Sequence, residues 1–122
     1  MVFCNTQRNT DFVANNLKAN GINALAIHGG YSQDKRTSTM KNFSSQNAAV
    51  LVCTDVAARG LDIQGITHII NYDGPLEALV YFHRIGRTGR AGASGIAVTL
   101  VSRREMATLK TIQSMTNTRM RE

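Results

Sequence analysis

The sequence has two cysteines and one proline, and neither residue type is placed to build a metal site or a linker. Cys4 and Cys53 each lie within a short apolar run, at no metal-binding or redox spacing, so we expect two small buried hydrophobic residues. No signal peptide or disulfide framework is visible, which makes a reducing, cytoplasmic location the expectation. Pro75 can mark the start of one helix. We predict no metal site.

Acidic residues and long apolar runs are also scarce. The chain has 8 Asp and Glu against 14 Lys and Arg, for a net charge of +6 and a pI near 9.9. Such a basic domain suits a polyanion, either a nucleic acid or a membrane surface. No apolar run approaches the ~20 residues of a membrane-spanning helix, and no basic amphipathic helix with aromatic anchors is evident. We therefore expect a nucleic acid as the partner.

The 122 residues amount to one domain, spanning 1–122. Short apolar runs alternate with helical patterns, which is typical of parallel strands joined by crossover helices. Residues 49–53 are continuously apolar, and this indicates strands that are covered on both faces. The sequence thus predicts an α/β fold with a doubly wound, mainly parallel sheet and helices on both faces. The predicted strands are residues 2–5, 24–27, 49–53, 68–72 and 96–101.

Four helices are predicted from their ends. The first two begin after the capping residues Thr6 and Ser32, and the first ends near Gly21. The third follows Pro75, and the fourth opens with a capping box at residues 102–105, Ser-Arg-Arg-Glu. The side chains expected to face the core from the first three helices are Phe12, Val13, Leu17, Met40, Phe43, Leu76, Leu79, Val80 and Phe82.

Polar residues and glycines follow four of the predicted strands, at residues 5–6, 28–30, 54–62 and 73–74. In open α/β sheets, ligands bind beyond the carboxyl ends of the strands. We therefore expect these segments to converge on a binding site.

Residues 83–90, His-Arg-Ile-Gly-Arg-Thr-Gly-Arg, carry three arginines at a spacing of three, and glycine directly precedes two of them. The guanidinium group matches phosphate oxygens in a bidentate way, and glycine lets the backbone approach a ligand. The alternative is a set of solvated arginines at the negative end of a helix dipole. The spacing alone does not separate these interpretations, but the loops at the strand ends favour phosphate binding.

Taken together, residues 54–62 (Thr-Asp-Val-Ala-Ala-Arg-Gly-Leu-Asp) and 83–90 resemble the second RecA-like domain of DEAD-box ATP-dependent RNA helicases. Nearly the whole chain takes part in the resemblance. Residues 2–6, the Gln-x-x-Arg element at 33–36, Asn-Tyr-Asp at 71–73 and residues 95–101 follow in the order of the family's motifs. His83 favours DEAD-box proteins, because DEAH-box and RecQ-like helicases usually begin the arginine motif with Gln. The resemblance implies a RecA-like fold.

The resemblance also implies roles for particular residues at an ATP site. Arg87 and Arg90 correspond to arginine fingers that neutralise charge on the transferring phosphoryl group. Asp62 would accept a hydrogen bond from the ATP ribose, Gly60 would let the backbone approach the sugar, and His83 would link the phosphate site to neighbouring motifs. Arg84 is expected to be structural or interdomain.

The RNA-binding residues implied by the resemblance are Thr6, Gly29, Gln33, Arg36, Thr54 and Asp55. They would hold phosphates and ribose hydroxyls, so binding without sequence preference is expected. Asp55 is better suited to organising its loop or pairing with a hydroxyl, because its charge repels phosphate. The family often has Asp where Gly30 stands, so one contact to RNA is expected to be missing or to come from the backbone alone.

In the family, ATP and Mg²⁺ lie between two RecA-like domains, and the first domain supplies the phosphate-binding loop and the acidic motif that holds the metal. Residues 1–122 contain neither Gly-x-x-x-x-Gly-Lys-Ser/Thr nor Asp-Glu-Ala-Asp. The resemblance therefore implies a fragment of a longer RNA-dependent ATPase, inactive alone, whose partners are RNA and the N-terminal RecA-like domain. A nonenzymatic RNA-binding or protein-docking module of the same fold, or half of a DNA helicase, stays open.

Three further polar side chains are expected to have structural roles or no special role. Arg59 is expected to form a structural ion pair within its loop, and His68 to be an ordinary strand residue. His28 is interpreted as a histidine at a strand end with its hydrogen bonds satisfied.

Overall fold

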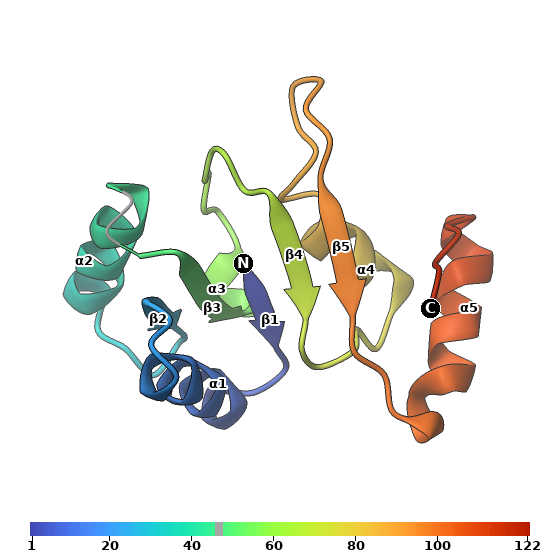
Figure 1. Cartoon of the computed structure of the whole chain (residues 1–122), viewed down its shortest axis with the longest axis horizontal. Coiled ribbons are helices and arrows are strands. Elements are labelled where there is room, and N and C mark those ends of the chain that lie inside the picture. Colours follow the sequence, from blue (N-terminus) through green and yellow to red (C-terminus); the bar gives the residue numbers. More distant parts are fainter. Residues whose placement is uncertain (46–47) are drawn as a thin grey trace.

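The computed structural model of the chain describes residues 1–45 and 48–122, and within them it contains a five-stranded parallel sheet (Figure 1). The strands are β1 (Val2–Cys4), β2 (Ala24–Ile27), β3 (Val50–Thr54), β4 (His68–Asn71) and β5 (Ile96–Thr99). Their order is β2-β3-β1-β4-β5. The chain thus moves to one side of β1 and then to the other, so the strand order reverses between β1 and β4, where open α/β sheets bind ligands. The predicted fold class is confirmed, with strand ends within two residues of the prediction.

The helices are α1 (Gln7–Ala19), α2 (Gln33–Ser44), α3 (Asp55–Ala58), α4 (Ala78–Ile85) and α5 (Met106–Thr116), with a 3-10 helix, η1 (Arg103–Glu105), before α5. The predicted caps are present: the side chain of Thr6 accepts a hydrogen bond from the amide of Asn9, and that of Ser32 from Lys35. The capping box of residues 102–105 also forms. The short helix α3 was not predicted.

The helices lie on both faces of the sheet. On one face, Val13 and Ala14 of α1 pack against Val2, Cys4 and other residues of the inner strands. On the other face, α2 and α3 cover a second cluster, which contains Phe3 and its neighbours on β2 to β4. Consecutive residues of β1 serve opposite faces because side chains alternate along a strand. In Figure 1, α4 lies behind β4 and β5, and α5 stands beyond the β5 edge.

The orientation predicted for α4 is wrong. The helix begins at Ala78, three residues after Pro75, and the side chains of Leu76, Leu79 and Phe82 are 72%, 62% and 47% exposed. Tyr81 and Arg84 are the buried residues of this helix instead. They share one face because residues three apart lie on the same side of a helix. The polar contacts of Arg84, rather than the apolar pattern, therefore orient α4.

Two other expectations about burial are also wrong. Phe12 is 56% exposed, whereas Phe43 packs against the core as expected. The edge strand β5 is not covered on both faces, since Ile96 and Val98 are 54% and 42% exposed. The apolar run of β5 therefore did not indicate two covering layers.

Both cysteines are free and buried, as predicted, and burial raises the pKa of each thiol to about 12. Across the described residues, no helix is long and apolar enough to cross a membrane.

Candidate nucleotide and nucleic-acid site

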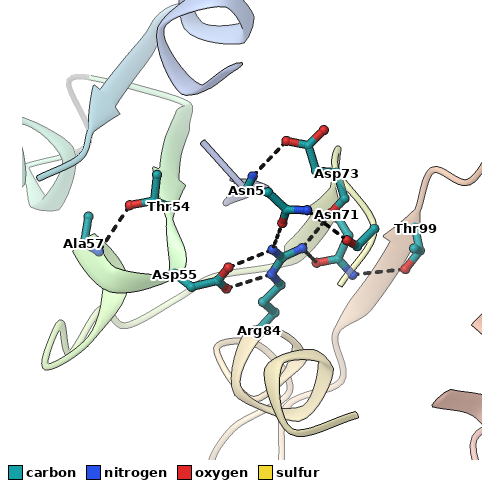
Figure 2. A network of polar contacts seen from close by, with 9 residues as sticks. Asn5, Thr54, Asp55, Ala57, Asn71, Asp73, Arg84 and Thr99 are labelled. Atoms are coloured by element: carbon teal, nitrogen blue, oxygen red, sulfur yellow. Dashed lines mark hydrogen bonds and ion pairs between the residues drawn. The ribbon is translucent and has the colours of Figure 1, made fainter. Parts of the chain in front are cut away.

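The carboxyl ends of β1, β3 and β4 meet around the guanidinium group of Arg84, which reaches them from α4 (Figure 2). Arg84 is 1% exposed and forms a bidentate pair with Asp55, at 2.7 Å from Nε to Oδ1 and 2.8 Å from Nη2 to Oδ2. It also donates to Oδ1 of Asn5 at 2.6 Å, to the carbonyl of Asp73 at 2.7 Å and to Oδ1 of Asn71 at 3.4 Å. A buried charge is tolerated when it is paired and hydrogen-bonded in this way. Arg84 is therefore structural.

The residues around Arg84 are held in turn by their own partners. Asn71 donates to Oγ1 of Thr99 on β5 at 3.0 Å. The amide of Asn5 donates to Oδ2 of Asp73 at 2.8 Å, and Nδ2 of Asn9 on α1 reaches the same carboxylate at 3.1 Å. The network thus joins the ends of four strands to the helices α1, α3 and α4. Sequence reasoning did not identify Asn71 as a partner of Arg84, although a polar residue within a buried strand is a signal that a hydrogen-bond partner exists.

Next to this network, an open groove of about 430 Å³ lies between the loop after α3 and the segment that includes the end of α4. The groove is lined by Gly60, Leu61, Asp62, Phe82, His83, Gly86, Arg87 and Arg90. All five residues predicted to contact the nucleotide are therefore brought together in one place.

Each of the two candidate finger arginines donates a hydrogen bond to a backbone carbonyl at the groove, and Arg90 also forms an exposed ion pair. Nη1 of Arg87 donates to the carbonyl of Leu61 at 2.5 Å, and Nε of Arg90 donates to the carbonyl of Gly86 at 2.6 Å. Nη1 of Arg90 lies 3.5 Å from Oδ1 of Asp62, with side chains 47% and 76% exposed. Exposed ion pairs of this kind stabilise little, so the guanidinium group of Arg90 can exchange this partner for a phosphate at low cost.

Gly60 has a backbone φ of +73°. Residues other than glycine rarely adopt this left-handed conformation. Glycine is therefore required where the chain turns from α3 into the groove. Arg59, the preceding residue, is exposed and forms no ion pair with any residue in 1–45 or 48–122, so the ion pair predicted within its loop is absent there.

The six residues predicted to contact RNA lie at the carboxyl ends of β1, β2 and β3 and on α2, apart from the lining of the nucleotide groove. Thr6, Gly29 and Gln33 are exposed, and Arg36 is half-buried. Gln33 and Arg36 line a second groove, of about 660 Å³, along α2. Leu61 lines both grooves, and the ion pair of Arg84 with Asp55 links the loop after Thr54 to α4.

Two of the predicted RNA-binding side chains already have partners within the domain. Thr54 is 8% exposed, and its Oγ1 accepts a hydrogen bond from the amide of Ala57 at 3.3 Å, which caps α3. The carboxylate of Asp55 is held by Arg84, in keeping with the expectation that Asp55 organises its loop.

His28 also has both ring nitrogens engaged, as expected for a satisfied histidine at the end of β2. Its Nδ1 accepts from the amide of Gly30 at 3.0 Å, and its Nε2 lies 3.0 Å from Oδ2 of Asp11 on α1. Tyr31 donates to Oδ1 of the same carboxylate at 2.8 Å. Burial alone would raise the pKa of Asp11, but the hydrogen bonds from Tyr31 and His28 hold it below its ordinary value. Sequence reasoning did not single out Asp11, because its partners follow 17 or more residues later.

Comparison with known proteins places this geometry in a family. The helicase conserved C-terminal domain model matches residues 1–92. The ATP-dependent RNA helicase CshA of Limosilactobacillus reuteri is 49% identical over 120 residues, which cover 98% of this chain and 24% of that protein. The chain thus spans about a quarter of the length of this curated relative.

Solved structures agree with the sequence comparison. A DEAD box protein from the hyperthermophile Methanococcus jannaschii superposes with a TM-score of 0.90 at 40% identity, over 97% of this chain and 32% of the other. Dbp5 of Saccharomyces cerevisiae, solved with RNA and ADP BeF3 bound, gives a TM-score of 0.86 at 32% identity, over 93% of this chain and 31% of the other. The chain therefore belongs to the helicase conserved C-terminal domain family, and it is similar to the C-terminal domains of DEAD-box RNA helicases.

Proposed function

We propose that this domain completes the ATP site of a longer, two-domain RNA helicase and couples ATP hydrolysis to the unwinding of RNA duplexes. The observation that carries the proposal is the single groove lined by Gly60, Asp62, His83, Arg87 and Arg90. A relative of similar sequence is named an ATP-dependent RNA helicase, and the related Dbp5 binds RNA and ADP BeF3. Both names support a groove that takes a nucleotide.

Arg87 and Arg90 act as arginine fingers on the phosphates of ATP bound between this domain and the N-terminal one. Such a finger contributes ~10³ to 10⁵ in rate, which corresponds to about 4–7 kcal/mol of barrier at ~1.4 kcal/mol per tenfold. When the guanidinium group of Arg90 leaves Asp62 to bind a phosphate, the carboxylate of Asp62 becomes free to accept a hydrogen bond from the ribose. Gly60 leaves room for the sugar because it carries no side chain. His83 links the phosphate site to the neighbouring motifs.

The N-terminal domain would hold most of the Mg²⁺ that accompanies ATP. Within the described residues, no group of three or more His, Cys, Asp or Glu side chains could hold a metal ion. Mg²⁺ prefers carboxylate and phosphate oxygens, so the ATP phosphates and the other domain are the better ligands. The chain alone therefore should not hydrolyse ATP.

RNA would lie across the carboxyl ends of β1, β2 and β3. Thr6, Gly29, Gln33 and Arg36 contact phosphates and ribose hydroxyls there. The hydroxyl of Thr54 accepts a hydrogen bond from Ala57 and still has its own hydrogen to donate to a phosphate. Such contacts fix the position of the RNA without reading its sequence.

Arg84 would be the mechanical link between the RNA and ATP sites. It holds Asp55, which follows Thr54, and it lies one turn before Arg87 on the same segment. A shift of the segment around Thr54 on RNA binding would therefore move α4 and reposition the finger arginines. This link accounts for RNA-dependent hydrolysis without any direct contact between RNA and nucleotide.

The decisive experiment measures RNA-stimulated ATP hydrolysis by the full-length protein. We expect Arg90→Ala to lower the rate at saturating RNA by about 10³-fold or more, the low end of the range for a finger. The exposed Arg103→Ala is the matched control, because it removes the same charge from η1, away from the groove. Near-normal turnover in Arg90→Ala would remove the finger assignment.

Two further arms of this experiment separate the alternatives. Single-stranded DNA in place of RNA should stimulate hydrolysis less, because the contacts to ribose hydroxyls are lost. Equal stimulation by DNA would favour a DNA helicase. Full-length protein that binds RNA but never hydrolyses ATP would favour a nonenzymatic RNA-binding module.

A further inference from the structure

The loop that contains the proposed RNA contact Gly29 is built around the imidazole of His28. The amide of Gly30 donates to Nδ1 of His28, which is 5% exposed, so the loop folds back onto its own histidine. A Cβ atom on Gly30 would lie 2.8 Å from Cε1 of His28 and 3.0 Å from Oε1 of Gln7. The ring of His28 thus occupies space that a side chain at position 30 would need.

The hydrogen bonds of His28 require one particular tautomer. Nδ1 accepts a hydrogen from Gly30, so it carries none of its own in the neutral ring. The ring proton must then lie on Nε2, which donates to the carboxylate of Asp11 at 3.0 Å. The tautomer of a histidine is set by the hydrogen bond that its other nitrogen makes, and here the acceptor is Asp11.

We propose that Asp11 of α1 is a positioning residue for RNA binding, because its carboxylate holds His28 in the orientation and tautomer that fix the Gly29–Gly30 loop. This proposal rests on the proposed contact of Gly29 with RNA. Asp11 lies outside every segment assigned to RNA or nucleotide, and it acts only through His28. Tyr31, which donates to the other oxygen of Asp11, keeps the carboxylate in place.

The test is Asp11→Ala, read out in two ways. Two-bond proton–nitrogen spectra of the chain should show His28 as the Nε2-protonated tautomer in the wild type. In the variant, a mixed population and a shifted Gly30 amide are expected. Binding of a fluorescein-labelled oligouridylate by the full-length protein should weaken about five- to tenfold, the usual effect of one lost hydrogen bond.

Three further variants make the test specific. Glu122→Ala removes the same charge from an exposed position after α5, away from the proposed RNA contacts, and should not weaken RNA binding. Tyr31→Phe removes the second bond to Asp11 and should preserve the His28 tautomer. His28→Asn places an oxygen where Nδ1 lies, so the loop keeps its acceptor and Asp11→Ala should cost less than twofold in that background.

The proposal is overturned if Asp11→Ala leaves the His28 tautomer and the Gly30 amide unchanged. It is also overturned if Asp11→Ala weakens RNA binding equally in the wild-type and His28→Asn backgrounds. If wild-type protein does not bind the oligouridylate at all, the proposed function fails. In that case the spectra would still report on the contact between Asp11, His28 and Gly30, so the two failures are distinguishable.

Discussion

Replacing Arg84 tests the claim that one buried guanidinium group organises the carboxyl edge of the sheet. Arg84→Met keeps a long, unbranched side chain but removes five hydrogen bonds from Asn5, Asp55, Asn71 and Asp73. Breaking a buried ion pair costs about 3–5 kcal/mol. The side chain of Asp55 is 33% exposed and can regain water, so we expect the lower part of that range, about 3–4 kcal/mol.

This magnitude is large enough to measure in simple unfolding experiments on the chain. For a domain of this size, about 4 °C per kcal/mol predicts a melting temperature lower by about 12–16 °C. With an m-value of about 2 kcal/mol/M, the urea midpoint should fall by about 1.5–2 M at unchanged m. Arg84→Lys should also destabilise, because one ammonium group cannot bridge the same acceptors.

A matched control and a double-mutant cycle complete the test. Arg103→Met on η1 removes an exposed arginine and should change stability by less than about 0.5 kcal/mol. The combination of Arg84→Met with Asp55→Asn should show a coupling of at least about 1 kcal/mol between the two residues. A loss below about 1 kcal/mol in Arg84→Met, or equal losses in Arg84→Met and Arg103→Met, would refute the structural role.

Three other perturbations give independent checks. Gly95→Ala should lower the free energy of unfolding in urea by about 1–3 kcal/mol, because the new Cβ would lie 2.7 Å from the amide nitrogen of Gly89 and against Thr88. Ser94→Ala is the control, and equal urea midpoints for the two variants would contradict this packing. The pKa of Asp11 is lowered in the folded state, so its carboxylate stabilises the fold at pH values above the unfolded pKa of 3.8, and this contribution is lost as the pH falls through the folded pKa. The urea midpoint of Asp11→Asn should therefore fall less steeply than that of the wild type between about pH 5 and pH 3. Parallel curves for the two proteins would contradict the contacts of Asp11. Arg36→Ala should reduce the salt dependence of RNA binding by about 0.7 in log–log slope, and an unchanged slope would argue against a phosphate contact.

Much of the fold was predictable because its signals are local. Short apolar runs predicted all five strands. The caps at Thr6 and Ser32 and the box at residues 102–105 involve partners three residues away. The motifs at residues 54–62 and 83–90 likewise indicated a helicase family, and the family comparison confirmed it. Short-range hydrogen bonds and periodicity are properties of a segment by itself, so the sequence alone was sufficient for them.

The orientation of α4 and the partners of its arginine were decided only by tertiary structure. The apolar residues Leu79 and Phe82 predicted one buried face, yet the helix turns Tyr81 and Arg84 inward because Asp55, 29 residues earlier, supplies the counter-charge. The pairing of Asp11 with His28 depends in the same way on how α1 packs beside the end of β2. The sequence by itself determined which segments form and which motifs they carry. The packed sheet decided which side chains meet, because hydrogen bonds between distant residues exist only after the strand ends have been brought together.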